Sequence, residues 1–131
     1  MSTEKDLTPS KLADELLKVA DFIYKTKPSE HIIEMNEKLY KAVGYSQWVG
    51  ARMNEAEYNY AVNREQNLAK LADMENETET TRKSKLDSWS AADKKLVQDL
   101  KNIKNNLRAI QMSLMQSIRS RREEMQMGGR S

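Results

Sequence analysis

The 131-residue sequence contains no cysteine and only one histidine. Without cysteine, the chain forms neither disulfides nor thiolate nucleophiles. Glycine and proline are also scarce, with four and two residues, whereas an all-β fold needs many such residues for its turns. We therefore expect an all-α protein.

Long apolar runs are absent as well. The apolar stretches are only a few residues long, and the first ten residues, MSTEKDLTPS, are polar and of mixed charge. A membrane-spanning helix needs about 20 apolar residues, and a secretory signal peptide needs an apolar segment after a basic start. We predict neither, and we expect the protein to act in the cytoplasm.

The sequence offers little for catalysis. The single His31 has no nucleophile pattern near it, and neither a metal-ligand spacing nor a glycine-rich phosphate loop is present. Carboxylate pairs such as Asp14 with Glu15 are adjacent on an expected helix, which is typical of a solvated face. We therefore expect a protein that is not an enzyme and that uses no cofactor and no metal.

Acidic residues are missing from one segment in particular. Between Leu100 and Arg122 there is no Asp or Glu, although the segment contains six Lys or Arg residues. Residues 1–81 carry a net charge of −5, and residues 82–122 carry a net charge of +8. Two interpretations follow: the basic segment binds a polyanion, or the two halves attract each other within or between chains.

Capping residues and apolar periodicity predict helices within a single helical domain, 1–131. Thr8 followed by Pro9 suits a helix start, because the Thr side chain caps free N–H groups and Pro lacks a donor that would be unpaired anyway. Pro28 suits a stop, because the residue before proline is disfavoured in the helical conformation. These signals predict a first helix over residues 9–26.

The second helical region is predicted over residues 29–74. Ser29 is a suitable cap for its start. Gly44 and Gly50 interrupt the apolar pattern, and each glycine lowers helix propensity by about 1 kcal/mol relative to alanine. We therefore expect a bend or a close helix approach near these glycines.

The remaining residues are predicted to form a connection and a final helix. Residues 75–89 show no clear apolar period and change from acidic to basic, which favours a connection. Ser90 suits an N-cap, and the Asp93 carboxylate three residues later suits the positive end of the helix dipole. We therefore predict a final helix over residues 90–126.

The final helix carries apolar residues four and three apart, which is the pattern of a coiled-coil seam that stops at Ser117. A hairpin of two long helices buries little area per chain, so we expect a homo-oligomer. The residues predicted at the oligomer interface are Trp48, Leu96, Leu100, Ile103, Leu107, Ile110 and Leu114.

The cations of the final helix also repeat, because several recur seven residues apart. Such a row of cations neutralises successive phosphates, although it also serves to solvate a helix or to pair with an acidic helix. Trp89, which lies among basic residues, is a candidate for base stacking, and a hydrophobic contact beside the helix cap explains it equally well. The candidate phosphate-binding residues are Lys70, Arg82, Lys83, Lys85, Lys94, Lys101, Lys104, Arg108, Arg119, Arg121 and Arg122.

Three short motifs occur in an order that resembles a known family. The segment YSQW at residues 45–48 is followed by WSAADKKLVQDLKNI and then by LMQSIRSRREEM. This arrangement resembles the UvsY family of phage recombination mediator proteins over about residues 39–125. Members carry a basic Lys-Ala-Arg stretch implicated in DNA contact, and the corresponding run here, NLAKLAD, keeps Lys70 but has no matching Arg.

The resemblance implies a helical protein that assembles into a ring, binds single-stranded DNA and has no catalytic activity. Its partners would be a strand-exchange recombinase and a single-strand-binding protein, in the cytoplasm of an infected host cell. The cations of the last helix are then expected to replace the missing Arg. The alternative is a structural or adaptor coiled-coil protein of a phage assembly that binds no nucleic acid.

Overall fold

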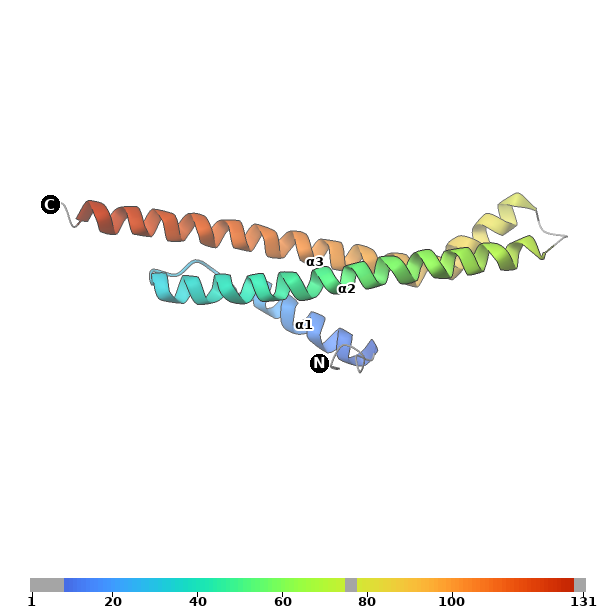
Figure 1. Ribbon diagram of the computed structural model, residues 1–131, viewed down its shortest axis with the longest axis horizontal. Helices are drawn as coiled ribbons and strands as arrows, with labels where there is room; N and C mark the ends of the chain where they lie inside the picture. Colours follow the sequence, from blue (N-terminus) through green and yellow to red (C-terminus); the bar gives the residue numbers. More distant parts are fainter. Residues whose placement is uncertain (1–8, 75–77, 129–131) are drawn as a thin grey trace. The chain divides into compact units, whose positions relative to one another are not determined.

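The computed structural model describes residues 9–74 and 78–128, and these residues form three helices (Figure 1). Helix α1 spans Pro9–Lys25, α2 spans Ile32–Ala72, and α3 spans Glu79–Gly128. The described residues contain no strand, so the predicted all-α fold with two long helices is confirmed. None of the helices in these ranges combines the length and the apolar composition needed to cross a membrane.

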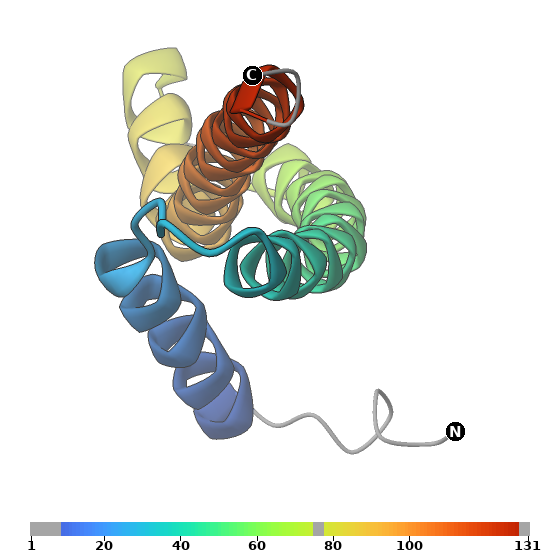
Figure 2. The ribbon, with the colours of Figure 1, turned by 90° about the vertical axis from the view of Figure 1, so that its left-hand side faces the viewer.

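The chain divides into two compact units, although a single domain was predicted. Unit 1 comprises Met1–Gln47 with Ile103–Ser131, and unit 2 comprises Trp48–Asn102. Unit 1 therefore holds α1, the first part of α2 and the last part of α3, which Figure 2 draws in blue, cyan and red. Unit 2 holds the rest of α2 and α3 with the segment that joins them.

The core of unit 1 is built from apolar side chains of all three helices. Met35 of α2 packs with Leu114 and Ile118 of α3, and these side chains are 1%, 1% and 5% exposed. Val19 of α1 is fully buried. The seam of α3 therefore continues past Leu114 by a step of four residues to Ile118. The predicted stop at Ser117 is wrong, because a step of four follows the natural 3.6-residue period of the helix.

The leucines predicted at the oligomer interface lie inside the chain itself. Leu100, Leu107 and Leu114 are 0%, 0% and 1% exposed, so they present no surface to a second copy. Their neighbours in the seam and Trp48 are half-buried. For these three leucines the prediction is corrected: the heptad pattern describes packing between helices of one chain, because an intramolecular hairpin needs the same seam as a dimer.

Helix α2 runs through Gly44 and Gly50 without interruption. A Cβ atom added at either glycine would meet nothing within 4 Å. The close helix approach expected at these residues is therefore wrong. The exposed position of Gly44 and the half-buried position of Gly50 leave room for a larger side chain at both sites.

The start of α2 is organised by Ser29, as predicted. The Ser29 Oγ accepts a hydrogen bond from the His31 N–H at 3.2 Å, and the Ser29 hydroxyl donates to Glu34 Oε2 at 2.9 Å. Lys38 Nζ forms an ion pair with Glu34 Oε1 at 3.2 Å. The Ser29 hydrogen bond and the Lys38 ammonium hold the pKa of Glu34 below its ordinary value of 4.5.

The Ser29→Ala variant is expected to raise the pKa of Glu34 toward 4.5, because the strongest group that favours the carboxylate is removed. A lowered folded-state pKa contributes stability above the unfolded pKa, and that contribution is lost as the pH falls through the folded pKa. The measurement is an NMR titration of the Glu34 carboxyl carbon. Ser88→Ala, in unit 2, should leave the titration unchanged, and an unchanged pKa in Ser29→Ala would contradict the assignment.

Helix α3 begins at Glu79, so the predicted connection over 75–89 and the predicted start at 90 are both wrong. Thr78 is the cap: its Oγ1 accepts the Thr81 N–H at 3.2 Å, and its carbonyl accepts the Arg82 N–H at 2.9 Å. The first turns of α3 lack an apolar period because most of their side chains are exposed. Lys, Arg and Glu are good helix formers without such a period.

Ser90 and Asp93 lie within α3 and do not cap it. Ser90 is only 6% exposed, and its Oγ has no hydrogen-bond partner among the described residues. Asp93 instead accepts a hydrogen bond from Asn63 Nδ2 of α2 at 3.0 Å, which joins the two helices within unit 2. The small Ser90 side chain fits this buried position, but its hydroxyl contributes no hydrogen bond to stability there.

The Ser90→Ala variant is therefore expected to stabilise the protein by about 1 kcal/mol, because it removes a buried, unsatisfied hydroxyl and raises helix propensity. An N-cap serine would give the opposite sign, a loss of about 1 kcal/mol. Urea denaturation measures the free energy of unfolding. The neighbouring Ser88 is exposed, so Ser88→Ala serves as the control and should change stability by less than about 0.5 kcal/mol.

Candidate nucleic-acid interface

Three lysines of α1 and early α2 are engaged by carboxylates of their own helix. Lys18 pairs with Glu15, Lys25 with Asp21, and Lys38 with Glu34, each at 3.2 Å. All three pairs lie three or four residues apart, so they form as soon as the helix forms. These cations are therefore poor candidates for binding an external anion.

The cations of α3 in unit 1 differ from these. Lys104, Arg108, Arg119 and Arg122 are exposed, and no ion pair joins them to a carboxylate within residues 9–74 and 78–128. Only Arg121 among the predicted cations of this segment is paired, with Glu124 at 3.2 Å, and both of these side chains are exposed. Most of the predicted phosphate-binding residues in this segment are thus accessible to a ligand.

Two of these arginines line a surface groove. Arg119 and Arg122 border a hollow of about 430 Å³ whose wall includes Leu39, Met115 and Ile118. A guanidinium above an apolar wall suits a ligand with an anionic edge and an apolar body, because Arg donates several hydrogen bonds in a fixed fork. A nucleotide has this character.

In unit 2, three further predicted cations are exposed: Lys83, Lys94 and Lys101. None of the three forms an ion pair within the part of the chain that the structure describes. Lys94 borders a wide hollow of about 740 Å³ together with Arg64. Carboxylates border this hollow and also the groove of unit 1, so the local charge is mixed at both surfaces.

Two residues predicted to bind phosphate make contacts within the chain. Arg82 Nη2 donates to the carbonyl of Met74 at 2.6 Å, and Lys85 Nζ lies 3.9 Å from Met74 Sδ. Both side chains are half-buried. Arg82 and Lys85 therefore contact Met74 within the chain and are less accessible than the exposed cations of α3.

The structure brings Lys70 and Trp89 together from different helices of unit 2. Lys70 Nζ lies 6.0 Å from the centroid of the Trp89 ring, and the Trp89 side chain is 39% exposed. An exposed indole beside an ammonium is a suitable surface for a base and its phosphate. The sequence contained both residues as candidates, but their proximity depends on the pairing of α2 with α3.

Trp48 contacts a buried cation and is not a free aromatic surface. Its ring lies 5.8 Å from Arg52 Cζ, and Arg52, which is 6% exposed, also pairs with Glu55 at 3.3 Å. Sequence reasoning did not consider Arg52, because a single Arg in an expected helix gives no signal of burial. Trp48 is half-buried, consistent with a packing role.

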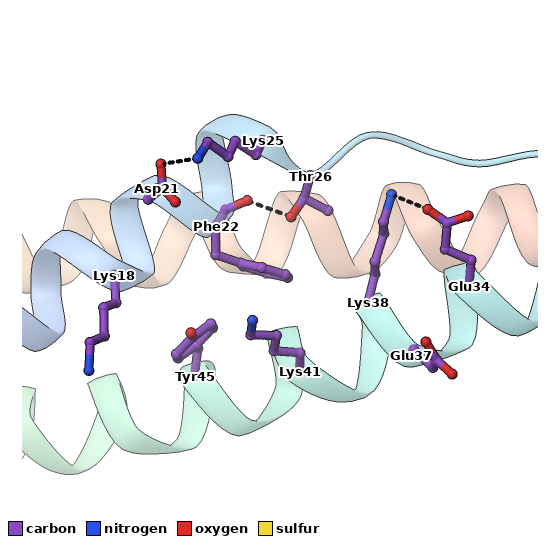
Figure 3. Close-up of a pocket in the computed structure, with 10 residues that line it drawn as sticks. All are labelled: Lys18, Asp21, Phe22, Lys25, Thr26, Glu34, Glu37, Lys38, Lys41 and Tyr45. Atoms are coloured by element: carbon purple, nitrogen blue, oxygen red, sulfur yellow. Dashed lines mark hydrogen bonds and ion pairs between the residues drawn. The ribbon is translucent and has the colours of Figure 1, made fainter.

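A second aromatic cluster, which sequence reasoning did not assemble, lies in unit 1 (Figure 3). The rings of Phe22 and Tyr45 pack with centroids 5.2 Å apart, and Lys41 Nζ lies 5.5 and 5.7 Å from the two centroids. These side chains border a groove of about 580 Å³ between α1 and α2. The residues are far apart in sequence, so only the docking of α1 reveals the cluster.

Groups of three or more His, Asp or Glu side chains that would suit a metal ion do not occur among residues 9–74 and 78–128. Comparisons with protein-family models, with curated proteins and with solved structures found no match to this chain.

Proposed function

We propose that this protein binds single-stranded DNA through the exposed cations of α3 and acts as a recombination mediator. In that role it helps a recombinase replace single-strand-binding protein on the strand. The observation that carries the proposal is the contrast between paired and unpaired cations. Lys18, Lys25 and Lys38 have carboxylate partners, whereas most predicted cations of α3 are exposed without one in the described residues.

The one-sided charge of α3 is costly unless an anion binds. Like charges one turn apart repel each other, and helices that need only solubility usually alternate the two signs. Lys104 and Arg108, four residues apart in unit 1, lie about 6 Å apart along the helix axis. A phosphate backbone that follows the helix would neutralise such cations in succession and release counterions.

A single strand is favoured over a duplex by the exposed aromatic side chain. Trp89 offers a ring face beside Lys70, and unpaired bases stack on such rings irrespective of sequence, whereas the bases of a duplex are already stacked. The resemblance to UvsY-family mediators supports the same ligand. This arrangement favours binding with little sequence preference.

The proposal includes self-association, because unit 1 exposes several large apolar side chains. Tyr40 is 84% exposed, Ile33 is 75% exposed, and Met112 is 63% exposed. Ile33 and Tyr40, seven residues apart, share one face of α2, and an exposed apolar face suits contact with a partner. A homo-oligomer, as a ring in the UvsY-like arrangement, would cover this surface and bring the cations of several copies to one strand.

The exposed methionines of α3 also favour a second candidate, a structural or adaptor protein. Met112 and Met115 lie between basic residues and are 63% and 56% exposed. Methionine is adaptable at protein interfaces, and a carboxylate-rich partner helix would neutralise the same cations. This candidate predicts assembly without DNA binding.

The direct test is fluorescence anisotropy with a labelled single-stranded oligonucleotide at several salt concentrations. Six engaged cations would give a slope of about −4 in a plot of log K against log salt concentration, at about −0.7 per phosphate contact. Light scattering in the same buffers reports assembly. A flat salt response, or no binding at low salt, would rule out phosphate-driven binding and favour the adaptor.

A further inference from the structure

The groove between α1 and α2 in unit 1 combines an aromatic wall with a mobile cation (Figure 3). Phe22 of α1 and Tyr45 of α2 form this wall, with an angle of 56° between the ring planes. Both side chains are half-buried, so they are held by the fold and still reach the groove. The ring centroids are only 5.2 Å apart, which leaves no room for a planar group between them. A planar ligand must therefore stack on the outer face of the pair.

Lys41 is the cation best placed to move. Its ammonium lies over both rings, and no ion pair joins it to a carboxylate within residues 9–74 and 78–128. Other lysines around the groove are held: Lys25 by Asp21, and Lys38 by Glu34. A contact between an exposed ammonium and a ring is weak, so a ligand that stacks on the ring can displace Lys41 and still bind its charge.

We propose that this groove binds one nucleobase of the single strand, which stacks on Tyr45, while Lys41 contacts the adjoining phosphate. This inference rests on the proposed function, because it places a second contact for the same strand in unit 1. The groove volume of about 580 Å³ is sufficient for a nucleotide.

The charges around the groove favour a nucleotide over an acidic peptide. Asp21, Glu34 and Glu37 border the groove together with the lysines. These carboxylates would repel an acidic side chain that entered the groove, whereas a nucleobase carries no charge and Lys41 would meet its phosphate. The amino groups of bases also donate hydrogen bonds to carboxylates, as cytosine does to Glu or Asp. The mixed charge is thus compatible with a base and one phosphate.

The test uses two fluorescein-labelled strands of equal length, one with ordinary bases and one with abasic sites throughout. Both carry the same phosphates, so only the first reports stacking. Tyr45→Leu keeps an apolar side chain in the wall and removes the ring. We expect it to weaken binding of the ordinary strand about tenfold and to leave the abasic strand unchanged. Tyr58→Leu, which removes an exposed tyrosine of the same helix, is the control and should change neither affinity.

Several results would overturn the inference. Equal binding of the ordinary strand by Tyr45→Leu and the wild type would exclude stacking on Tyr45, and an equal loss with both strands would indicate a change in the fold. Salt-dependent binding by the wild type in either case leaves the proposed function intact, whereas no binding of either strand contradicts both proposals.

A measurement on the wild-type protein does not depend on how the variant folds. Ultraviolet cross-linking to a strand that contains 5-iododeoxyuridine, followed by peptide mapping, should place adducts on Tyr45 or Phe22. Adducts confined to Trp89 would contradict the groove as a base-binding site.

Discussion

Replacing Lys104, Arg108 and Arg122 together by glutamine should weaken binding of single-stranded DNA by about 100-fold at 0.1 M salt. The estimate follows from counterion release: three lost phosphate contacts, at about 0.7 each, reduce the salt slope by about 2, which is a factor of about 100 at one-tenth of molar salt. These side chains are exposed and form no ion pair within residues 9–74 and 78–128, so the substitution should leave the helices and the assembly unchanged. Anisotropy titrations at several salt concentrations measure both quantities.

The control for this variant changes the net charge by the same amount. Lys25→Gln, Lys27→Gln and Lys38→Gln together also remove three positive charges from unit 1. Lys25 and Lys38 already have carboxylate partners, however. We expect this variant to lose less than about fivefold in affinity, because exposed local ion pairs contribute little and their cations are already neutralised.

Two outcomes would contradict the assignment of α3 as the DNA surface. Equal losses in the two triple variants would show that binding follows net charge alone. Dissociation of the assembly by the α3 variant, without any DNA binding by the wild type, would instead identify the cations as contacts to a partner helix and favour the adaptor.

Leu114→Ala should destabilise the protein by about 3 kcal/mol, because it removes a side chain that is 1% exposed from the cluster with Met35 and Ile118. For a chain of this length, such a loss lowers the melting temperature by about 10 °C. Thermal unfolding followed by circular dichroism measures the shift. Leu17→Ala is the matched control, since Leu17 is 68% exposed and its truncation should change stability by less than about 0.5 kcal/mol.

The concentration dependence of this effect distinguishes the two possible roles of the seam. If Leu114 packs within one chain, the difference in melting temperature between wild type and variant stays the same when the protein is diluted. If it packs between chains, the variant should lose stability increasingly on dilution, because unfolding is then coupled to dissociation. A strong concentration dependence would restore the original prediction of an oligomer interface.

The helices were predictable because their ends carry strong local signals. Pro9 starts α1 in both the prediction and the structure, and α2 and α3 end within two residues of their expected ends. Prolines and glycines act through their own backbone geometry, so they are informative without tertiary contacts. The start of α3 was not predictable from apolar periodicity, because residues 79–89 form a largely exposed helix that Thr78 caps.

The sequence identified many residues of the candidate site, but it predicted only part of their arrangement in space. The charge pattern identified candidate cations on α3 and left open whether they are exposed or paired, and the structure shows that Arg108, for example, is exposed. The pattern could not show that Arg82 binds a carbonyl of its own chain, since a cation that caps a turn and one that faces solvent look alike in sequence. The cluster of Phe22, Lys41 and Tyr45 requires the docking of α1 on α2. The apolar face of α1 predicts that the helix docks, but it does not predict which residues of the two helices face each other.

The exposed methionines of α3 differ sharply from the buried Met35 of α2 in their access to oxidants. Met112, Met115, Met125 and Met127 are 56–72% exposed, whereas Met35 in the core is 1% exposed. Dilute peroxide would therefore convert the outer thioethers to polar sulfoxides and spare the interior one. The arginines and lysines beside them would keep their charge. Helix α3 would therefore lose apolar contacts with a partner and keep its ionic contacts.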